Sequence, residues 1–173
     1  MQYAVISDTH DNYYNLKQAI KIIKEHGIST CFHLGDYCAP GVVKAMVAHK
    51  ELKWRGVWGN VDGARAQIVL AQKGNPNFDI SFESFRELDL SEGKVFLTHY
   101  PRLAKLAARS GEYKAVFHGH THEKSKEKLE NGTLLANPGE LAGCKTGQPS
   151  FGIWKPDTND IEIIDLKDFI VAK

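Results

Sequence analysis

Short apolar runs alternate with amphipathic segments along the first two thirds of the chain, and this alternation most constrains the fold. Residues 3–7 are expected to form a buried strand because they read as a continuous apolar run. Residues 15–26 are expected to form a helix, with apolar side chains on one face, lysines opposite and Gly27 after its end. The same pattern predicts strands at 30–34, 54–58 and 115–118, and helices from Pro40, at 64–71 and at 102–109.

The other segments have the pattern of antiparallel strands. Asn131-Gly132 is a strong hairpin signal between two such segments. The strand pairs expected are 82–90 with 94–98, 126–130 with 133–137, and 151–155 with 160–166. A chain that starts as β-α-β and ends in hairpins is expected to be of the α/β (α+β) class, with a mixed β-sandwich and helices on its outer faces. Its 173 residues, without a linker or repeat, predict one domain over 1–173.

Composition argues against several classes of protein. The chain has no apolar run of about 18 residues, so no membrane span is expected. Its first residues lack a basic region and a cleavage signal, so no secretory signal is expected. Three widely spaced cysteines are no disulfide framework, which favours a cytoplasmic location. A formal net charge of +1 gives no strong nucleic-acid signal.

Polar side chains follow five of the predicted strands, at the point where each strand ends. Because ligands bind where the carboxyl ends of strands gather, these side chains are expected to form one cluster. The candidates are Asp8, His10, Asp36, Asn60, His99, His120 and His122. Taken singly, each motif reads more simply as a turn, a helix cap or a structural histidine. Five such motifs in order, each at a strand end, favour a functional site.

Carboxylates and imidazoles together suit borderline divalent ions such as Mn, Fe, Zn or Ni. Seven ligands are more than one ion takes, so two ions that share a carboxylate are expected. Two ions about 3.5–4 Å apart are typical of hydrolytic phosphoryl transfer. The glycines in Gly35-Asp36, Gly59-Asn60 and Gly119-His120 would let the backbone turn sharply beside such ions.

The ordered set of motifs resembles the calcineurin-like metallophosphoesterase superfamily, and the short chain resembles its small YfcE-type phosphodiesterases. The resemblance covers residues 3 to about 166 and implies a four-layer α/β/β/α sandwich of two mixed β-sheets flanked by helices. It also implies a bridging water or hydroxide as nucleophile. The implied ligands are Asp8, His10, Asp36 and His122 for the first ion, and Asp36, Asn60, His99 and His120 for the second, with Asp36 bridging.

Three positions depart from the family pattern. Val61 stands where many members have the histidine that protonates the leaving group, so good leaving groups are expected. Tyr100 follows His99 where glycine is usual, and it either packs as an aromatic or reaches the substrate cleft. Glu140 stands where the YfcE-type group often has serine; it either repels a phosphate or is a surface charge, and we expect a surface charge.

Further candidates lie next to the motifs. Asp62 is expected either to cap the helix that begins near Gly63 or to orient Asn60. Arg65 and Arg102 either hold a phosphate or are solvated surface residues. Two histidines one position off the ligand register, His33 and His118, are expected to be strand residues rather than ligands.

These observations predict a metal-dependent phosphodiesterase that hydrolyses small phosphate esters, with Mn as the expected ion and Fe, Ni or Zn as alternatives. Two alternatives remain. One is a non-catalytic scaffold like the retromer subunit of this fold, which Val61 favours and the intact set of seven ligands disfavours. The other is a nuclease of the superfamily, which the charge disfavours. No sequence feature sets the oligomeric state. Two divalent ions with Asp8 and Asp36 would leave a formal charge of +2 in the crevice, which favours a small anionic substrate.

Overall fold

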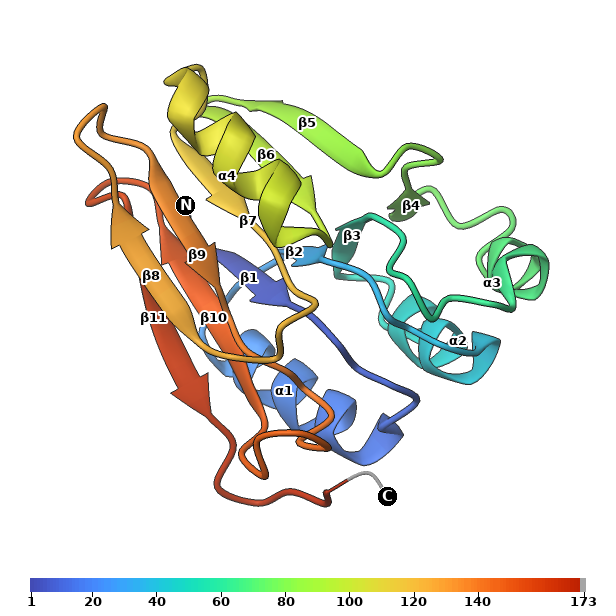
Figure 1. Ribbon diagram of the computed structural model, residues 1–173. Coiled ribbons are helices and arrows are strands. Elements are labelled where there is room, and N and C mark those ends of the chain that lie inside the picture. Colours follow the sequence, from blue (N-terminus) through green and yellow to red (C-terminus); the bar gives the residue numbers. More distant parts are fainter. Residues whose placement is uncertain (172–173) are drawn as a thin grey trace.

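Two mixed β-sheets face each other at the centre of the molecule, in a computed structural model that describes residues 1–171 (Figure 1). The first sheet has the order β11-β10-β1-β2-β3-β4. Its strands are β1 (Tyr3–Ile6), β2 (Thr30–His33), β3 (Lys53–Gly56), β4 (Phe78–Ile80), β10 (Ser150–Lys155) and β11 (Asp160–Asp165). Strands β1 to β4 are parallel, and the β10–β11 hairpin adds antiparallel strands beside β1.

The second sheet has the order β5-β6-β7-β9-β8. Its strands are β5 (Phe85–Leu90), β6 (Gly93–Thr98), β7 (Ala115–Phe117), β8 (Ser125–Lys128) and β9 (Leu134–Asn137). Strands β6, β7 and β9 are parallel, and an antiparallel strand closes each edge. Both sheets are therefore mixed, as the family resemblance implied.

Helices cover the outer face of each sheet, which makes four layers. The helices are α1 (Tyr13–Glu25), α2 (Pro40–Ala48), α3 (Arg65–Ala71) and α4 (Pro101–Ser110). One apolar cluster joins the outer face of the first sheet to α1, α2 and α3, and another joins the second sheet to α4. No helix among residues 1–171 is both long and apolar enough to span a membrane.

A third apolar cluster fills the space between the sheets. Successive strand side chains point to opposite faces, so Val5 of β1 faces the second sheet while Ala4 and Ile6 face the helices. Phe117 of β7 contacts Trp154 of β10 edge to face, with 5.6 Å between ring centroids. Burial on both faces explains why β1, β2 and β7 read as continuous apolar runs.

The strand register brings the functional loops to one edge of the sandwich. In the first sheet, Ile6 is paired with His33, and His33 with Gly56. In the second sheet, Leu97 is paired with Phe117. The carboxyl ends of β1, β2 and β3 therefore lie level with one another, as do those of β6 and β7, and the packing of the sheets places both sets together.

The structure departs from the predicted elements around residues 73–90. Strand β4 has only three residues, too few for a periodic pattern, and it forms by pairing Phe78 with Trp54 of β3. The strand predicted at 82–90 begins at Phe85. Phe82 lies outside it, with 83% of its surface exposed, so the apolar character of this residue extended the prediction too far.

Candidate metal centre

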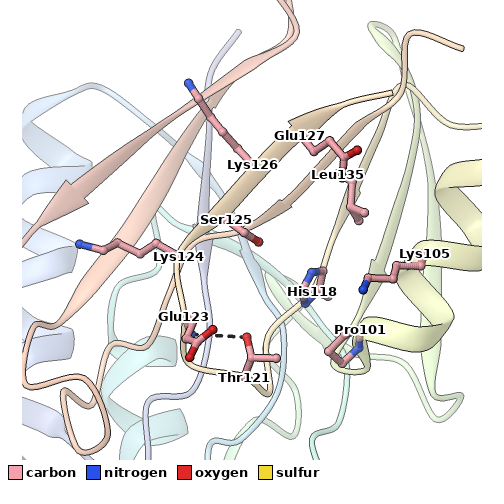
Figure 2. Close-up of a pocket in the computed structure, with 10 residues that line it drawn as sticks. All are labelled: Pro101, Lys105, His118, Thr121, Glu123, Lys124, Ser125, Lys126, Glu127 and Leu135. Carbon is pink, nitrogen blue, oxygen red and sulfur yellow. Dashed lines mark hydrogen bonds between the residues drawn. The ribbon is translucent and has the colours of Figure 1, made fainter. Parts of the chain in front are cut away.

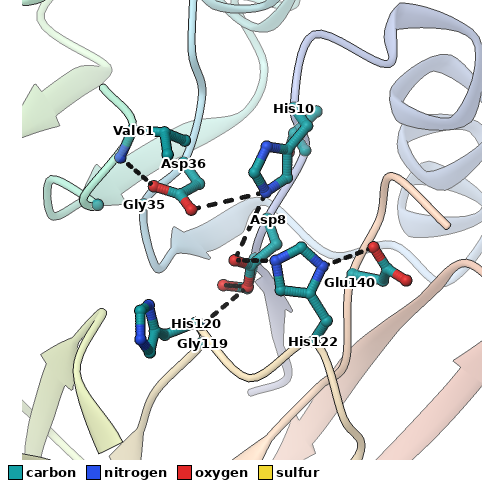
Figure 3. Close-up of polar contacts among 12 residues, drawn as sticks. Asp8, His10, Gly35, Asp36, Val61, Gly119, His120, His122 and Glu140 are labelled. Atoms are coloured by element: carbon teal, nitrogen blue, oxygen red, sulfur yellow. Dashed lines mark hydrogen bonds and ion pairs between the residues drawn. The ribbon is translucent and has the colours of Figure 1, made fainter. Parts of the chain in front are cut away.

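All seven candidate side chains lie in the loops at the shared edge of the two sheets, and Figure 3 labels Asp8, His10, Asp36, His120 and His122. They are Asp8 and His10 after β1, Asp36 after β2, Asn60 after β3, His99 after β6, and His120 and His122 after β7. The sequence therefore predicted the position of every one of these residues in the fold. Two groups of contacts divide the set.

The first group consists of Asp8, His10, Asp36 and His122, and one ligand atom from each lies within 4.8 Å of the others. His10 Nε2 is 3.5 Å from Asp36 Oδ2 and 3.9 Å from Asp8 Oδ1. His122 Nε2 is 3.3 Å from Asp8 Oδ1. These separations are close to those of atoms that share one ion at ~2.0–2.2 Å.

The second group surrounds Asn60, which lies between two histidines. Its Oδ1 is 2.8 Å from His99 Nε2 and 2.8 Å from His120 Nδ1. His99 Nε2 is also 3.4 Å from Asp36 Oδ2. The same oxygen of Asp36 therefore contacts one histidine from each group, and the two groups meet at this carboxylate.

Two buried atoms in the first group have no hydrogen-bond partner, namely Asp8 Oδ1 and His10 Nε2. Buried polar atoms are almost always paired, because leaving one without a partner is costly. The other oxygen of Asp8 accepts from the Ser7 hydroxyl at 2.5 Å and from the His120 N–H at 3.1 Å. The unpaired atoms thus face the centre of the cluster, and the residues fit a divalent metal ion.

Contacts on the far side of two imidazoles set their orientation. His99 Nδ1 donates to the Leu34 carbonyl at 2.8 Å, so Nε2 is the nitrogen that faces Asn60 and Asp36. His122 Nδ1 is 2.7 Å from a carboxylate oxygen of Glu140, so its Nε2 faces Asp8 in the same way. Such contacts orient metal-binding histidines in general.

Glu140 corrects the expectation of a surface charge. Its side chain is fully buried, and its second oxygen accepts from the backbone N–H groups of Lys145 and Thr146. Burial alone raises the pKa of Glu140, but the bonds from His122, Thr146 and Cys144 outweigh it and hold that pKa well below its usual range. Nothing local in the sequence marks Glu140, because its partners lie in loops before and after it.

Asp62 does not cap a helix, contrary to one of the two roles expected for it. Helix α3 has Ala64 at its N-cap and no side-chain cap. Asp62 instead accepts from the N–H groups of Gly59 at 2.7 Å and Asp36 at 3.0 Å, and from that of Cys38 at 2.9 Å. It therefore holds the loops that carry Asn60 and Asp36 together.

The site stores backbone strain. Five of the seven candidate ligands have positive φ although none is glycine, a conformation that costs ~1–3 kcal/mol per residue. They are Asp8 (51°), His10 (42°), Asp36 (59°), His120 (73°) and His122 (67°). Such residues persist only where the surrounding structure fixes them, and they cluster at functional sites.

The charges at the centre act on one another. Burial raises the pKa of Asp8. Burial would also raise the pKa of Asp36, but its contact with His99 and the Val61 N–H outweigh burial and lower it. Burial lowers the pKa of His99, yet its contact with Asp36 and the charges of both aspartates outweigh that and raise it. Both carboxylates therefore favour positive charge beside them.

The remaining candidates have different positions. Tyr100 lies beside the second group, with its ring centroid 5.3 Å from that of His99. Arg65 stacks on Trp58 at 5.2 Å and donates to the Gly59 carbonyl at 3.2 Å, so it supports the Asn60 loop. Arg102 is an exposed residue of α4.

Neither off-register histidine lies among the candidate ligands. His33 ends β2 as expected and contacts Thr9. His118 follows the last residue of β7 and lines a separate pocket of about 360 Å³ with Pro101 and Lys105 (Figure 2).

Two free cysteines, Cys38 and Cys144, also contact candidate ligands. Cys38 Sγ is 3.4 Å from His10 Nδ1. Cys144 Sγ is 3.8 Å from His122 Nδ1 and donates to Glu140 at 3.1 Å. The position of Cys38 two residues after Asp36 was the one local signal for such a contact.

Facing mixed sheets with carboxylates and imidazoles at their shared edge define a metallophosphoesterase. The chain matches the calcineurin-like phosphoesterase superfamily domain over residues 1–159. It belongs to this superfamily and is a hydrolase of phosphoric esters.

Individual relatives agree with this assignment. The chain is 31% identical over 169 residues to phosphodiesterase MJ0936 of Methanocaldococcus jannaschii, covering 96% of this chain and 100% of that protein. The structure of a novel archaeal phosphodiesterase is similar with a TM-score of 0.85 at 31% identity, over 96% of this chain and 100% of the other. Yfce, a phosphoesterase from E. coli, shares the fold with a TM-score of 0.68 at 20% identity, over 95% of this chain and 98% of the other.

A substitution at Gly59 tests how closely the loop after β3 must approach Asp36 in the loop after β2. A Cβ at Gly59 would overlap the side chain and backbone of Asp36. We expect Gly59→Ala to weaken Mn²⁺ binding at least tenfold in calorimetric titration because Asp36 must move. Gly63→Ala is the control, since a Cβ there meets nothing within 4 Å. Equal Mn²⁺ affinity in both variants would contradict the packing described.

The pH dependence of stability tests the buried state of His33. Burial lowers the pKa of His33 to about 3 from 6.5, and its Nδ1 accepts from the Gly35 N–H. Between those values the unfolded chain binds a proton that the folded chain does not, so stability is lost as the pH falls below about 6.5. The expected slope is up to about 1.4 kcal/mol per pH unit.

Urea unfolding of metal-free protein from pH 7 to pH 4 measures this slope. His33→Asn keeps an acceptor near Nδ1 and should flatten the slope, whereas His26→Asn, at an exposed histidine, should not. An unchanged slope in His33→Asn would show that His33 does not cause it.

Proposed function

We propose that the protein is a phosphodiesterase that hydrolyses small phosphate esters with two divalent ions, one in each group of ligands. The observation that carries this proposal is the position of Asp36 Oδ2, 3.5 Å from His10 Nε2 and 3.4 Å from His99 Nε2. One carboxylate oxygen between two sets of donors suits a bridging ligand. The 31% identity to an archaeal phosphodiesterase supports a diester substrate.

The chain's own residues bind and position the reactants. Bound ions would activate a water molecule and neutralise the phosphate oxygens. Asp8, His10 and His122 would hold the first ion, and Asn60, His99 and His120 the second, with Asp36 shared. The Val61 N–H donates to Asp36 Oδ1 at 3.0 Å, which keeps the other oxygen of that carboxylate toward the histidines.

Val61 limits the leaving group. It is 44% exposed beside Asn60 and carries no proton to donate. Without an acid at this position, a leaving group departs readily only if it is stable as an anion, such as an aryl oxide. We propose Mn as the activating ion, with Fe, Ni or Zn as alternatives that carboxylate and imidazole ligands also suit. We place the activity in the cytoplasm because the three cysteines are free.

Hydrolysis of bis-(p-nitrophenyl) phosphate tests the proposal. The wild type should be inactive after chelation and regain activity with Mn²⁺, Fe²⁺, Ni²⁺ or Zn²⁺. Asp36→Ala should lose more than about 100-fold in kcat/KM because both ions lose a ligand. The control Asp157→Ala changes an exposed aspartate in a turn and should keep full activity. If the protein turns over no substrate with any of these ions, the result would favour a non-catalytic scaffold. If it cleaves oligonucleotides in preference to small esters, the result would favour a nuclease.

Restoring an acid at Val61 tests the limit on leaving groups. Val61→His should raise kcat for alkyl phosphodiesters by about 100-fold, the lower range for general acid catalysis. It should change nitrophenyl hydrolysis by less than about threefold, because that leaving group needs no proton. Val61→Leu is the control without an acid. Equal gains for both kinds of ester would contradict the proposed role.

A further inference from the structure

Glu140 is a buried carboxylate at the candidate centre that the ligand set does not include. It lies on the far side of His122 from Asp8 (Figure 3), with Oε2 2.7 Å from His122 Nδ1. His122 Nε2 is in turn 3.3 Å from Asp8 Oδ1. The buried carboxylate of Glu140 therefore contacts the imidazole of His122, which in turn contacts Asp8 of the first group of candidate ligands.

The loop after Glu140 holds its carboxylate in place. Oε1 accepts from the Lys145 N–H at 2.9 Å and from the Thr146 N–H and hydroxyl, while Oε2 accepts from the Cys144 N–H at 3.0 Å. Three successive backbone donors suit an anion, and an amide could not accept from all of them. The site therefore suits a charged glutamate that accepts a hydrogen bond from His122 Nδ1.

We propose that Glu140 is a positioning residue that fixes His122 as a ligand of the first ion, and that its charge tunes the centre toward singly charged diesters. The inference rests on the proposed function. Two divalent ions bring four positive charges, and Asp8, Asp36 and Glu140 bring three negative ones. With a neutral water molecule bound, the remaining formal charge of +1 matches a phosphodiester, whereas the +2 left by two aspartates would favour a doubly charged monoester.

Glu140→Gln tests both parts, because it keeps the size of the side chain and removes its charge. Mn²⁺ affinity at one site, measured by calorimetric titration, should fall 10- to 100-fold, the range for residues that orient metal ligands. The ratio of kcat/KM for bis-(p-nitrophenyl) phosphate to that for p-nitrophenyl phosphate should fall about tenfold. Unchanged affinity and an unchanged ratio would overturn the proposal.

Two control variants separate positioning from loop structure and net charge. Thr146→Val removes one of several donors to Glu140 but leaves its charge and its contact with His122, so its Mn²⁺ affinity should fall less than that of Glu140→Gln and the ester ratio should not change. A loss as large as that of Glu140→Gln would assign the effect to the loop and overturn the positioning role. Glu130→Gln changes the net charge equally at an exposed site and should alter neither readout.

Melting curves of the metal-free variants show whether each one folds. If Glu140→Gln does not fold, Glu140→Ser takes its place, with the same expected loss of Mn²⁺ affinity. Unchanged affinity and an unchanged ester ratio in Glu140→Ser would then overturn the proposal. If the wild type hydrolyses neither ester, the proposed function fails. The Mn²⁺ titrations then still decide whether Glu140 supports a metal ligand.

Discussion

Two buried carboxylates, Asp8 and Asp36, lie where the carboxyl ends of both sheets meet, and the rest of the site depends on them. Burying two negative charges side by side is unfavourable unless positive charge accompanies them. The fold supplies imidazoles from both sheets around these aspartates, and it leaves Asp8 Oδ1 without a hydrogen-bond partner. A site of this kind is completed by cations, as expected of a member of the calcineurin-like phosphoesterase superfamily.

The apolar core makes this burial possible. Strands β1 and β2 pack on the second sheet with one face and on helices with the other. The loops that follow them therefore begin at fixed positions. Asp8 and Asp36 have the left-handed backbone conformation, which turns the chain sharply directly after each strand. Backbone strain at these positions is offset by the stability of the layers below. The same arrangement brings His99 of the second sheet against Asp36 of the first.

The sequence predicted the layers and the positions of the candidate ligands in the fold because both depend on local patterns. An apolar run followed by Asp8 or Asp36 marks a strand and its polar end together. Glu140 could not be found in this way, since its burial depends on donors from Cys144 to Thr146 and on His122 from an earlier loop. The role of Asp62 likewise depends on an N–H group 26 positions earlier, and β4 exists only through its pairing with β3.

A crystal structure of Mn²⁺-loaded protein, with anomalous scattering at the manganese edge, tests the central claim most directly. The account predicts two peaks about 3.5–4 Å apart on either side of Asp36. One should lie among Asp8, His10 and His122, and the other among Asn60, His99 and His120. A single peak, or ions placed away from Asp36, would contradict a centre in which one carboxylate joins the two groups.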